Sequence, residues 1–210
     1  MDRAIETFVD DIRSGDFVLF FFAGHSVQSE DQNYLLPCDD DRIRNLPDLK
    51  YRAVNAQRAL ELMSAKAPFV IVYLLDCCRT YLLPSLAKSR ATEISSRGMA
   101  PMIARGGSLV ASACAPGETA ADATSNGRNG LFTYHLLQQM TKPGENITML
   151  MLDLTQAVAT ETNQKQIPYY TSSLQTRDVY LVPPTTQTPR PELILSQVAQ
   201  LSLNSEMNGE

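Results

Sequence analysis

Several features that would point to a membrane or a nucleic acid are missing from this chain of 210 residues. It has no apolar run of the roughly eighteen residues that a membrane-spanning helix needs. Its first residues, MDRAIETFVDDIRSGD, are acidic overall, whereas a secretory signal begins with a basic and then an apolar stretch. The net charge is -5, and a nucleic-acid-binding surface is normally basic. We therefore expect a cytoplasmic protein that contacts neither a membrane nor a nucleic acid.

Cysteine is also scarce, and its spacing excludes two kinds of site. The four cysteines are Cys38, Cys77, Cys78 and Cys114, and none has the paired CxxC spacing of a zinc site or a disulfide framework. Free thiols are typical of a reducing compartment. The composition is otherwise that of a folded domain, with 44% hydrophobic and 20% charged residues.

Apolar runs and helical periods alternate along the chain. Three continuous apolar runs predict strands buried on both faces of a sheet, at residues 17–23, 69–75 and 108–114. Apolar residues at helical spacing predict helices at 5–12, 56–63, 131–140 and 147–158, and two short strands are expected at 168–171 and 179–182. The alternation is typical of a three-layer α/β/α fold with a mostly parallel sheet.

Several stretches of the chain show no regular apolar pattern. A polar loop is expected after the first strand, and a flexible loop over residues 80–107, which carries several basic residues. From Pro183 the composition shifts to proline, threonine and glutamine. We therefore predict one domain over residues 1–182, followed by a linker and a mobile tail over 183–210.

The residues suited to nucleophilic catalysis stand at the ends of two successive strands. His25 follows the first apolar run, and Cys78 follows the second, about 50 residues later. Parallel strands joined by one helix are usually neighbours, so these two ends should meet at one edge of the sheet. A thiol attacks as the thiolate and needs a base beside it, which His25 would supply.

Four motifs in this order resemble those of the caspase-like cysteine peptidases. They are FFFAGHS after the first strand, LLDCCR after the second, SACAPGETAAD after the third, and GLFTYHLLQQM opening a helix. The likeness is greatest to the paracaspase and metacaspase branches and covers about residues 1 to 182. It implies a cysteine endopeptidase, with proteins or peptides as its substrates.

The resemblance assigns roles to the two strand ends. It makes Cys78 the nucleophile, His25 the base, and the backbone N–H groups of Cys78 and of the Gly24–Ser26 segment the oxyanion hole. Ser26 stands where the family usually has glycine, and its Cβ would crowd the turn if φ were positive there.

Substrate preference is expected to follow from two acids. Asp76 lies two residues before the nucleophile, and Asp122 best matches the family's second acid, with Glu118 close by as the alternative. Two carboxylates in one pocket favour arginine or lysine before the cleaved bond. A structural alternative for Asp76 is a hydrogen bond within its own turn.

The resemblance also bears on cofactors and partners. No organic cofactor is implied. Metacaspases often require calcium, and the acidic run Asp39–Asp41 is the nearest match to a calcium site, although consecutive carboxylates lack the alternate spacing of a ligand loop. Self-cleavage in the basic loop 80–107 and pairing of two copies near the C-terminus are further expectations.

The match is incomplete at the N-terminus. The family's sheet normally begins with a strand, a helix and a second strand that precede the first helix seen here, so the His25 strand should become an exposed edge. A catalytically weak interaction or scaffold protein is therefore the alternative function. A third reading is a redox-sensing pair formed by Cys77 and Cys78.

Overall fold

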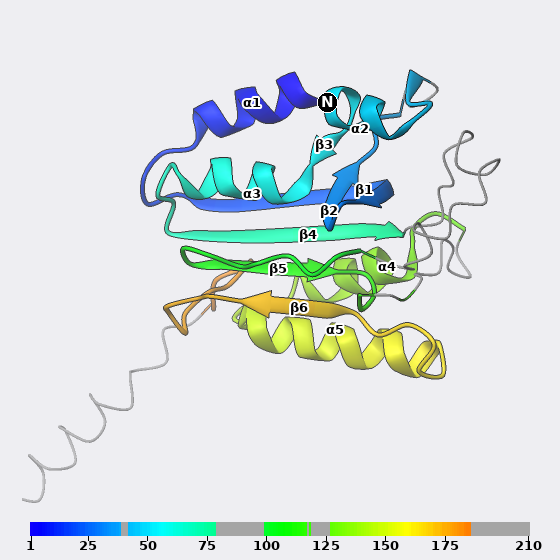
Figure 1. Ribbon diagram of the computed structural model, residues 1–210. Coiled ribbons are helices and arrows are strands. Elements are labelled where there is room, and N and C mark those ends of the chain that lie inside the picture. Colours follow the sequence, from blue (N-terminus) through cyan, green and yellow to red (C-terminus); the bar gives the residue numbers. More distant parts are fainter. Residues whose placement is uncertain (39–41, 79–98, 117, 119–126, 186–210) are drawn as a thin grey trace, which may run out of the picture.

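A six-stranded mixed sheet forms the centre of the molecule (Figure 1). The computed structural model describes residues 1–38, 42–78, 99–116, 118 and 127–185. The strands lie in the order β3-β2-β1-β4-β5-β6. Their bounds are Phe17–Ser29 for β1, Gln32–Leu35 for β2, Val54–Asn55 for β3, Val70–Cys78 for β4, Ser108–Ser112 for β5 and Tyr169–Ser172 for β6.

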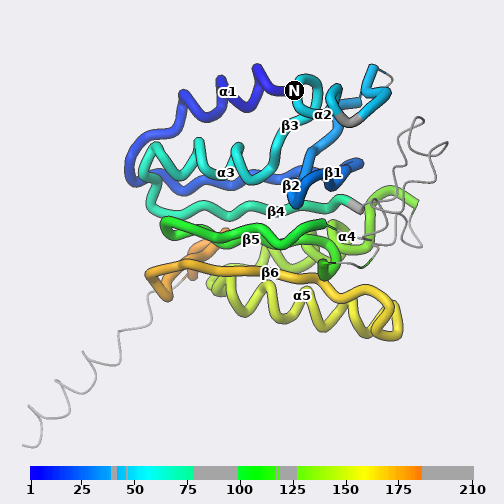
Figure 2. The backbone as a smooth tube through the Cα atoms, viewed as in Figure 1, coloured from blue at the N-terminus to red at the C-terminus, as the bar shows by residue number. Residues whose placement is uncertain are grey.

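The sheet is parallel at its centre and antiparallel at both sides. β1, β4 and β5 run parallel to one another, whereas β2, β3 and β6 are joined by antiparallel pairing. Figure 2 shows β1, β4 and β5 side by side, with the chain of β2 and β3 rising from them towards α2. The predicted α/β fold is confirmed. The sheet is mixed, because the three apolar runs form its parallel centre and shorter strands add antiparallel pairs on both sides.

Helices cover both faces and complete three layers. α1 and α3 pack with Ile71, Tyr73 and Leu75 of β4, whereas α4 and α5 pack with the alternating residues Val70, Val72 and Leu74. The helices are α1 at Asp2–Asp11, α2 at Leu46–Arg52, α3 at Ala56–Ser64, α4 at Leu131–Gln139 and α5 at Ile147–Glu161. None of the helices in the described ranges is long and apolar enough to cross a bilayer.

The prediction that the first strand is buried on both faces is wrong for one face. Phe17, Leu19 and Phe21 are 42%, 38% and 44% exposed. Of β1, only the second half, Ser26–Ser29, pairs with β2. In the described part of the chain, the first half of β1 therefore has β4 on one side and no strand on the other. The apolar cluster beneath α4 and α5 contains residues of β4 and β5 but none of β1.

Several elements were missed or misplaced by the sequence patterns. β2 lies in the stretch that was expected to be a polar loop, and α2 and β3 lie between that loop and α3, where no element was predicted. α2 begins with a reciprocal cap between Asn45 and Asp48, with Pro47 in its first turn, and this combination is a local signal for a helix start. The expected strand at 179–182 is only an isolated bridge between Tyr180 and Asn146.

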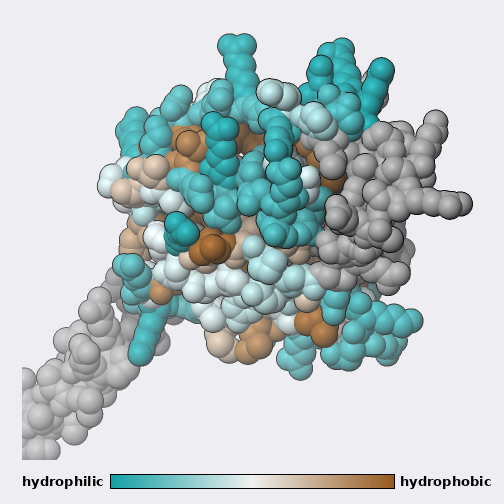
Figure 3. Space-filling view, in the orientation of Figure 1, coloured by the Kyte–Doolittle hydropathy of each residue, from teal (hydrophilic) through white to brown (hydrophobic). Residues whose placement is uncertain are grey.

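The long helices and the remaining strands agree with the patterns. Asn55 caps α3 as expected, accepting from Arg58 N at 2.9 Å. Figure 3, in the same orientation as Figure 1, shows polar side chains over most of the α1 and α3 side, with apolar atoms in separate small patches.

Candidate active site

His25 and Cys78 occupy directly opposite positions on neighbouring parallel strands. The pairing of β1 with β4 runs from Phe17 with Val70 to His25 with Cys78, which is its last pair. Neighbouring strands lie about 4.8 Å apart, so the two backbones are close at this point. His25 is exposed. The structure describes Cys78 as a strand residue of β4, and its side chain lies outside the description.

A change of strand partner places His25 at the edge of the parallel sheet. Immediately after it, Ser26 pairs with Leu35 of β2, and Leu36 N donates to the carbonyl of His25 at 2.9 Å. β1 therefore leaves β4 at His25 and continues as one strand of an antiparallel pair. The candidate base is thereby held by hydrogen-bonded backbone at the carboxyl end of the parallel pairing, where α/β proteins form their sites.

The backbone around His25 is extended and unstrained. Neither Gly24 nor Ser26 has a positive φ, so the crowding that was anticipated at Ser26 does not arise. Ser26 is 1% exposed, and its Oγ has no hydrogen-bond partner among the described residues. Gly24 is needed for another reason, because a Cβ there would lie 3.0 Å from the ring of Phe22.

Asp76 lies on the face of the sheet that α4 covers. Its Oδ2 accepts a hydrogen bond from the backbone N of Thr133 at 3.2 Å and a second, short one from Thr133 Oγ1. Asp76 is directly opposite Ala23, and His25 and Cys78 follow two positions later on the same strands. Because alternate residues of a strand share a face, Asp76 and His25 belong to one side of the sheet.

A family comparison identifies the domain to which these strands belong. The model of the peptidase C14 family, described as the caspase domain, matches residues 1–180. The chain belongs to the caspase-domain family. Members of this family are cysteine peptidases that act on protein substrates.

Two solved structures resemble this chain at low sequence identity. Caspase-1 from Spodoptera frugiperda is 18% identical with a TM-score of 0.53, over 89% of this chain and 71% of that one. Protein GSU0716 from Geobacter sulfurreducens is 14% identical with a TM-score of 0.49, over 86% of this chain and 74% of that one. No curated protein sequence matches this chain. At 18% identity the likeness to the Spodoptera caspase-1 shows the fold alone.

Other expected site residues of the caspase domain are only partly described. Asp122, the acidic run Asp39–Asp41 and most of the basic loop, residues 79–98, lie outside the described residues. Glu118 is described: its carbonyl accepts from Cys114 Sγ at 3.2 Å, and its Oε2 is buried with no hydrogen-bond partner among the described residues. Within the described ranges, no group of three or more histidine, cysteine or acidic residues could hold a metal ion.

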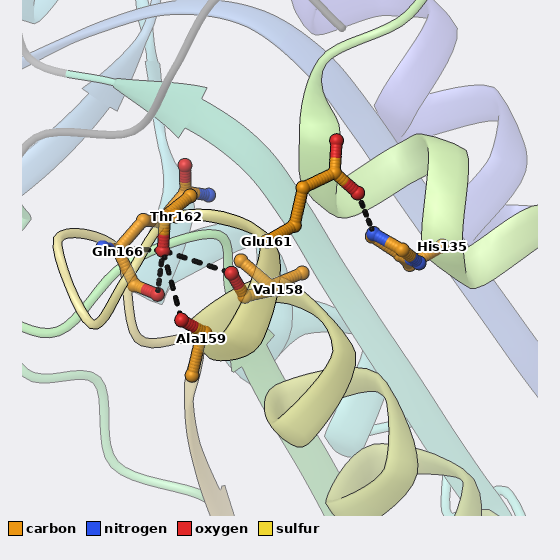
Figure 4. A network of polar contacts seen from close by, with 6 residues as sticks. All are labelled: His135, Val158, Ala159, Glu161, Thr162 and Gln166. Atoms are coloured by element: carbon orange, nitrogen blue, oxygen red, sulfur yellow. Dashed lines mark hydrogen bonds and ion pairs between the residues drawn. The ribbon is translucent and has the colours of Figure 1, made fainter.

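A network of polar contacts joins α4 to the end of α5 (Figure 4). His135 of α4 lies 2.7 Å from Glu161 of α5 through Nε2 and Oε2. In the turn that follows, Thr162 Oγ1 donates to the carbonyls of Val158 and Ala159 at the end of α5. The contact of His135 with Glu161 could not be read from the sequence, because it joins two separate helices.

The same turn reaches the end of β5. Thr162 Oγ1 accepts from Gln166 N at 3.1 Å, and the buried Nε2 of Gln166 donates to Ala113 O at 2.8 Å. Together with the His135–Glu161 contact, this bond fixes the position of α4, the helix that meets Asp76, against the rest of the caspase domain.

Proposed function

We propose that this caspase-domain protein is a cysteine endopeptidase with a Cys78–His25 dyad. The observation that carries the proposal is the register of β1 and β4, which sets these two backbone positions side by side at the end of their parallel pairing. An imidazole beside a thiol activates it by accepting its proton, because the thiolate is the nucleophile. The exposure of His25 leaves this edge of the sheet accessible to a peptide.

The proposed reaction has two halves. The Cys78 thiolate attacks the carbonyl carbon of the scissile bond, and the His25 imidazolium gives its proton to the leaving amine, which yields a thioester. Water then attacks the thioester while His25 accepts a proton, and the thiolate leaves as the carboxylic acid forms. This chemistry requires no organic cofactor.

The oxyanion formed in each half needs hydrogen-bond donors. We assign this role to the backbone N–H of Cys78 and to N–H groups in the Gly24–Ser26 segment. The ordinary extended backbone of Ser26 supports the assignment, because a serine at this position then distorts no turn. Loss of one such donor typically costs about 3–4 kcal/mol of barrier.

We further propose cleavage after arginine or lysine, as in the paracaspase and metacaspase branches. Asp76 supports this preference because its carboxylate lies on the same face of the sheet as His25. Asp122 is proposed as the second acid of the pocket. The protein would act on proteins or peptides in the cytoplasm, as a monomer or a homodimer.

A fluorogenic peptide panel tests this function. Peptides that differ only in having arginine, lysine, aspartate or norleucine before the cleaved bond would be offered to the wild type, Cys78→Ala and His25→Ala. We expect cleavage after arginine and lysine, abolished in both variants. Labelling by a peptidyl-arginine electrophile should likewise be lost in Cys78→Ala. Fastest cleavage after aspartate would overturn the basic preference, and activity retained by Cys78→Ala would overturn the dyad.

A second candidate function is an interaction protein with weak or no catalysis. The exposed apolar row of Phe17, Leu19 and Phe21 favours it, because such a row on a strand is suited to binding another chain. A folded chain that neither cleaves the panel nor reacts with the electrophile would support this candidate.

The redox reading is less favoured by the structure. Cys77 is buried, its Sγ lies 3.2 Å from Met99 Sδ, and it belongs to the cluster beneath α1 and α3. A thiol buried in that cluster is poorly placed to meet an oxidant from solution.

A further inference from the structure

The start of α4 and the end of β4 meet at one carboxylate. Gly130 is the N-cap residue of α4 and has no side chain that could accept from the N–H groups of the first turn. Asp76 Oδ2 takes over that role, accepting from the backbone N of Thr133, the third residue of the helix, and from its hydroxyl. A strand residue thus caps a helix that begins more than fifty residues later in the chain.

Gly130 is what allows this close approach. A Cβ at this position would lie 2.7 Å from Asp76 Oδ2, closer than Cβ atoms are found to approach, and 3.2 Å from Oδ1, which is a tight contact. The φ of Gly130 is −60°, an ordinary value, so the backbone conformation does not require glycine. The missing side chain makes room for the carboxylate.

Thr133 is too buried to meet a substrate itself. It is 8% exposed, and its backbone N–H and its hydroxyl both donate to the same oxygen of Asp76. These two bonds hold Oδ2 against the first turn of α4 and so favour one side-chain rotamer of Asp76. The partial positive charge at a helix N-terminus also favours a negative group there.

We propose that Thr133 is a positioning residue for substrate recognition: its two hydrogen bonds hold Asp76 in the orientation that receives the basic side chain before the cleaved bond. This inference rests on the proposed function and adds to it the source of the specificity. A charged pocket discriminates well only if its acid is held in place, because a misplaced carboxylate loses most of a charge-assisted contact.

The same geometry limits how Asp76 can bind arginine. A carboxylate that pairs with a guanidinium through two parallel bonds uses both oxygens. Oδ2 already accepts two hydrogen bonds from Thr133, which use its two lone pairs. Asp76 therefore provides a point contact to the cation, and any two-bonded recognition of arginine depends on a second acid such as Asp122.

The test measures how well a charged and a neutral substrate are cleaved by variants of Thr133 and by a matched control. Thr133→Val removes the hydroxyl and keeps the shape and the backbone N–H, whereas Thr133→Ser keeps the hydroxyl. The matched control is Thr155→Val in α5, where the lost hydroxyl bond goes to the carbonyl of Met151 at 2.7 Å. Each protein receives a pair of peptides that carry arginine or neutral citrulline before the cleaved bond.

We expect Thr133→Val to raise the KM for the arginine peptide, with kcat much less affected. Its arginine-to-citrulline ratio of kcat/KM should fall by roughly ten- to a hundredfold. Thr133→Ser should restore most of the ratio, and Thr155→Val should keep that of the wild type. Thermal melts establish that each variant is folded. Gly130→Ala, which displaces the carboxylate without touching Thr133, should lower the ratio as well.

The outcomes separate this inference from the function on which it rests. A wild type that prefers arginine, together with an unchanged ratio in folded Thr133→Val and Gly130→Ala, would overturn the positioning role and leave the peptidase intact. A wild type that cleaves neither peptide would overturn both. A loss of kcat alone, equal for the two peptides, would show that Thr133 supports the fold of the site and not its specificity.

Discussion

β1 and β4 have the same kind of sequence but different surroundings. Both are continuous apolar runs, and both were expected to be buried on two faces. β4 meets this expectation, since its residues from Val70 to Leu75 are all buried, with β1 and β5 on either side. Among the described strands, the first half of β1 has only β4 beside it, and every second side chain there is about two-fifths exposed.

The difference shows what an apolar run does and does not specify. It predicts a strand that contributes to a core, and both strands do so through the face beneath α1 and α3. It does not specify how many neighbours cover the strand, because pairing partners come from distant parts of the chain. An open, apolar strand edge is a place where another chain can add.

The largest expected effect comes from the same substitution in the two strands. Leu74→Ala in β4 leaves a cavity in the cluster beneath α4 and α5 and should lower the free energy of unfolding by about 2–5 kcal/mol. Leu19→Ala in β1 removes a side chain already exposed to water and should cost less than about 1 kcal/mol. Urea denaturation of both variants measures the two losses. Equal losses would mean that the exposed face of β1 is covered in solution.

The parts of the fold that were predicted are those with a local signal. α5 repeats apolar residues at helical spacing, and all five of the residues used to predict it are buried. β2 and β3 were missed because they have four and two residues, and their pairing is specified by each other and by the end of β1. No local pattern carries that information.

In the candidate site too, one part was predicted from local signals and another part was not. The ends of two successive apolar runs predicted that His25 and Cys78 would be neighbours, and the register places their backbones opposite each other. The catalytic roles of these residues remain predictions. The contact of Asp76 with Thr133 could not be foreseen, because it joins a strand to a helix that lies far along the chain. Only tertiary packing brings the two together.

A smaller effect on stability is expected where side chains of β1 and β4 meet on the face of the sheet that α1 and α3 cover. The ring of Tyr73 stacks on Phe20 at 4.4 Å between centroids, and its hydroxyl donates to Ala56 O at 3.1 Å. Burial raises the pKa of Tyr73, and the nearby Cys77 adds to the shift. Tyr73→Phe should cost about 1 kcal/mol at neutral pH through loss of this hydrogen bond.

The pH dependence of the free energy of unfolding tests the burial of Tyr73 more directly. Above about pH 10 an unfolded tyrosine loses its proton, whereas folded Tyr73 keeps it, so the unfolded state binds fewer protons and the wild type loses stability as pH rises. Tyr73→Phe lacks this loss, and the two stabilities should converge between about pH 9 and 11. Tyr51→Phe, at an exposed position, is the control and should follow the wild type. Parallel profiles for wild type and Tyr73→Phe would contradict the burial of this ring.

The smallest effect is expected in the second half of β1, where β2 joins the sheet. Ser26 is almost fully buried there, and its hydroxyl has no hydrogen-bond partner among the described residues. A buried hydroxyl without a partner is destabilising, so Ser26→Ala should raise the free energy of unfolding by about 0.5 kcal/mol. Ser29→Ala, at a partly exposed position of the same strand, is the control and should change little. If Ser26→Ala instead lowers stability in urea denaturation, the hydroxyl has a partner in solution, and this half of β1 is better satisfied than the structure indicates.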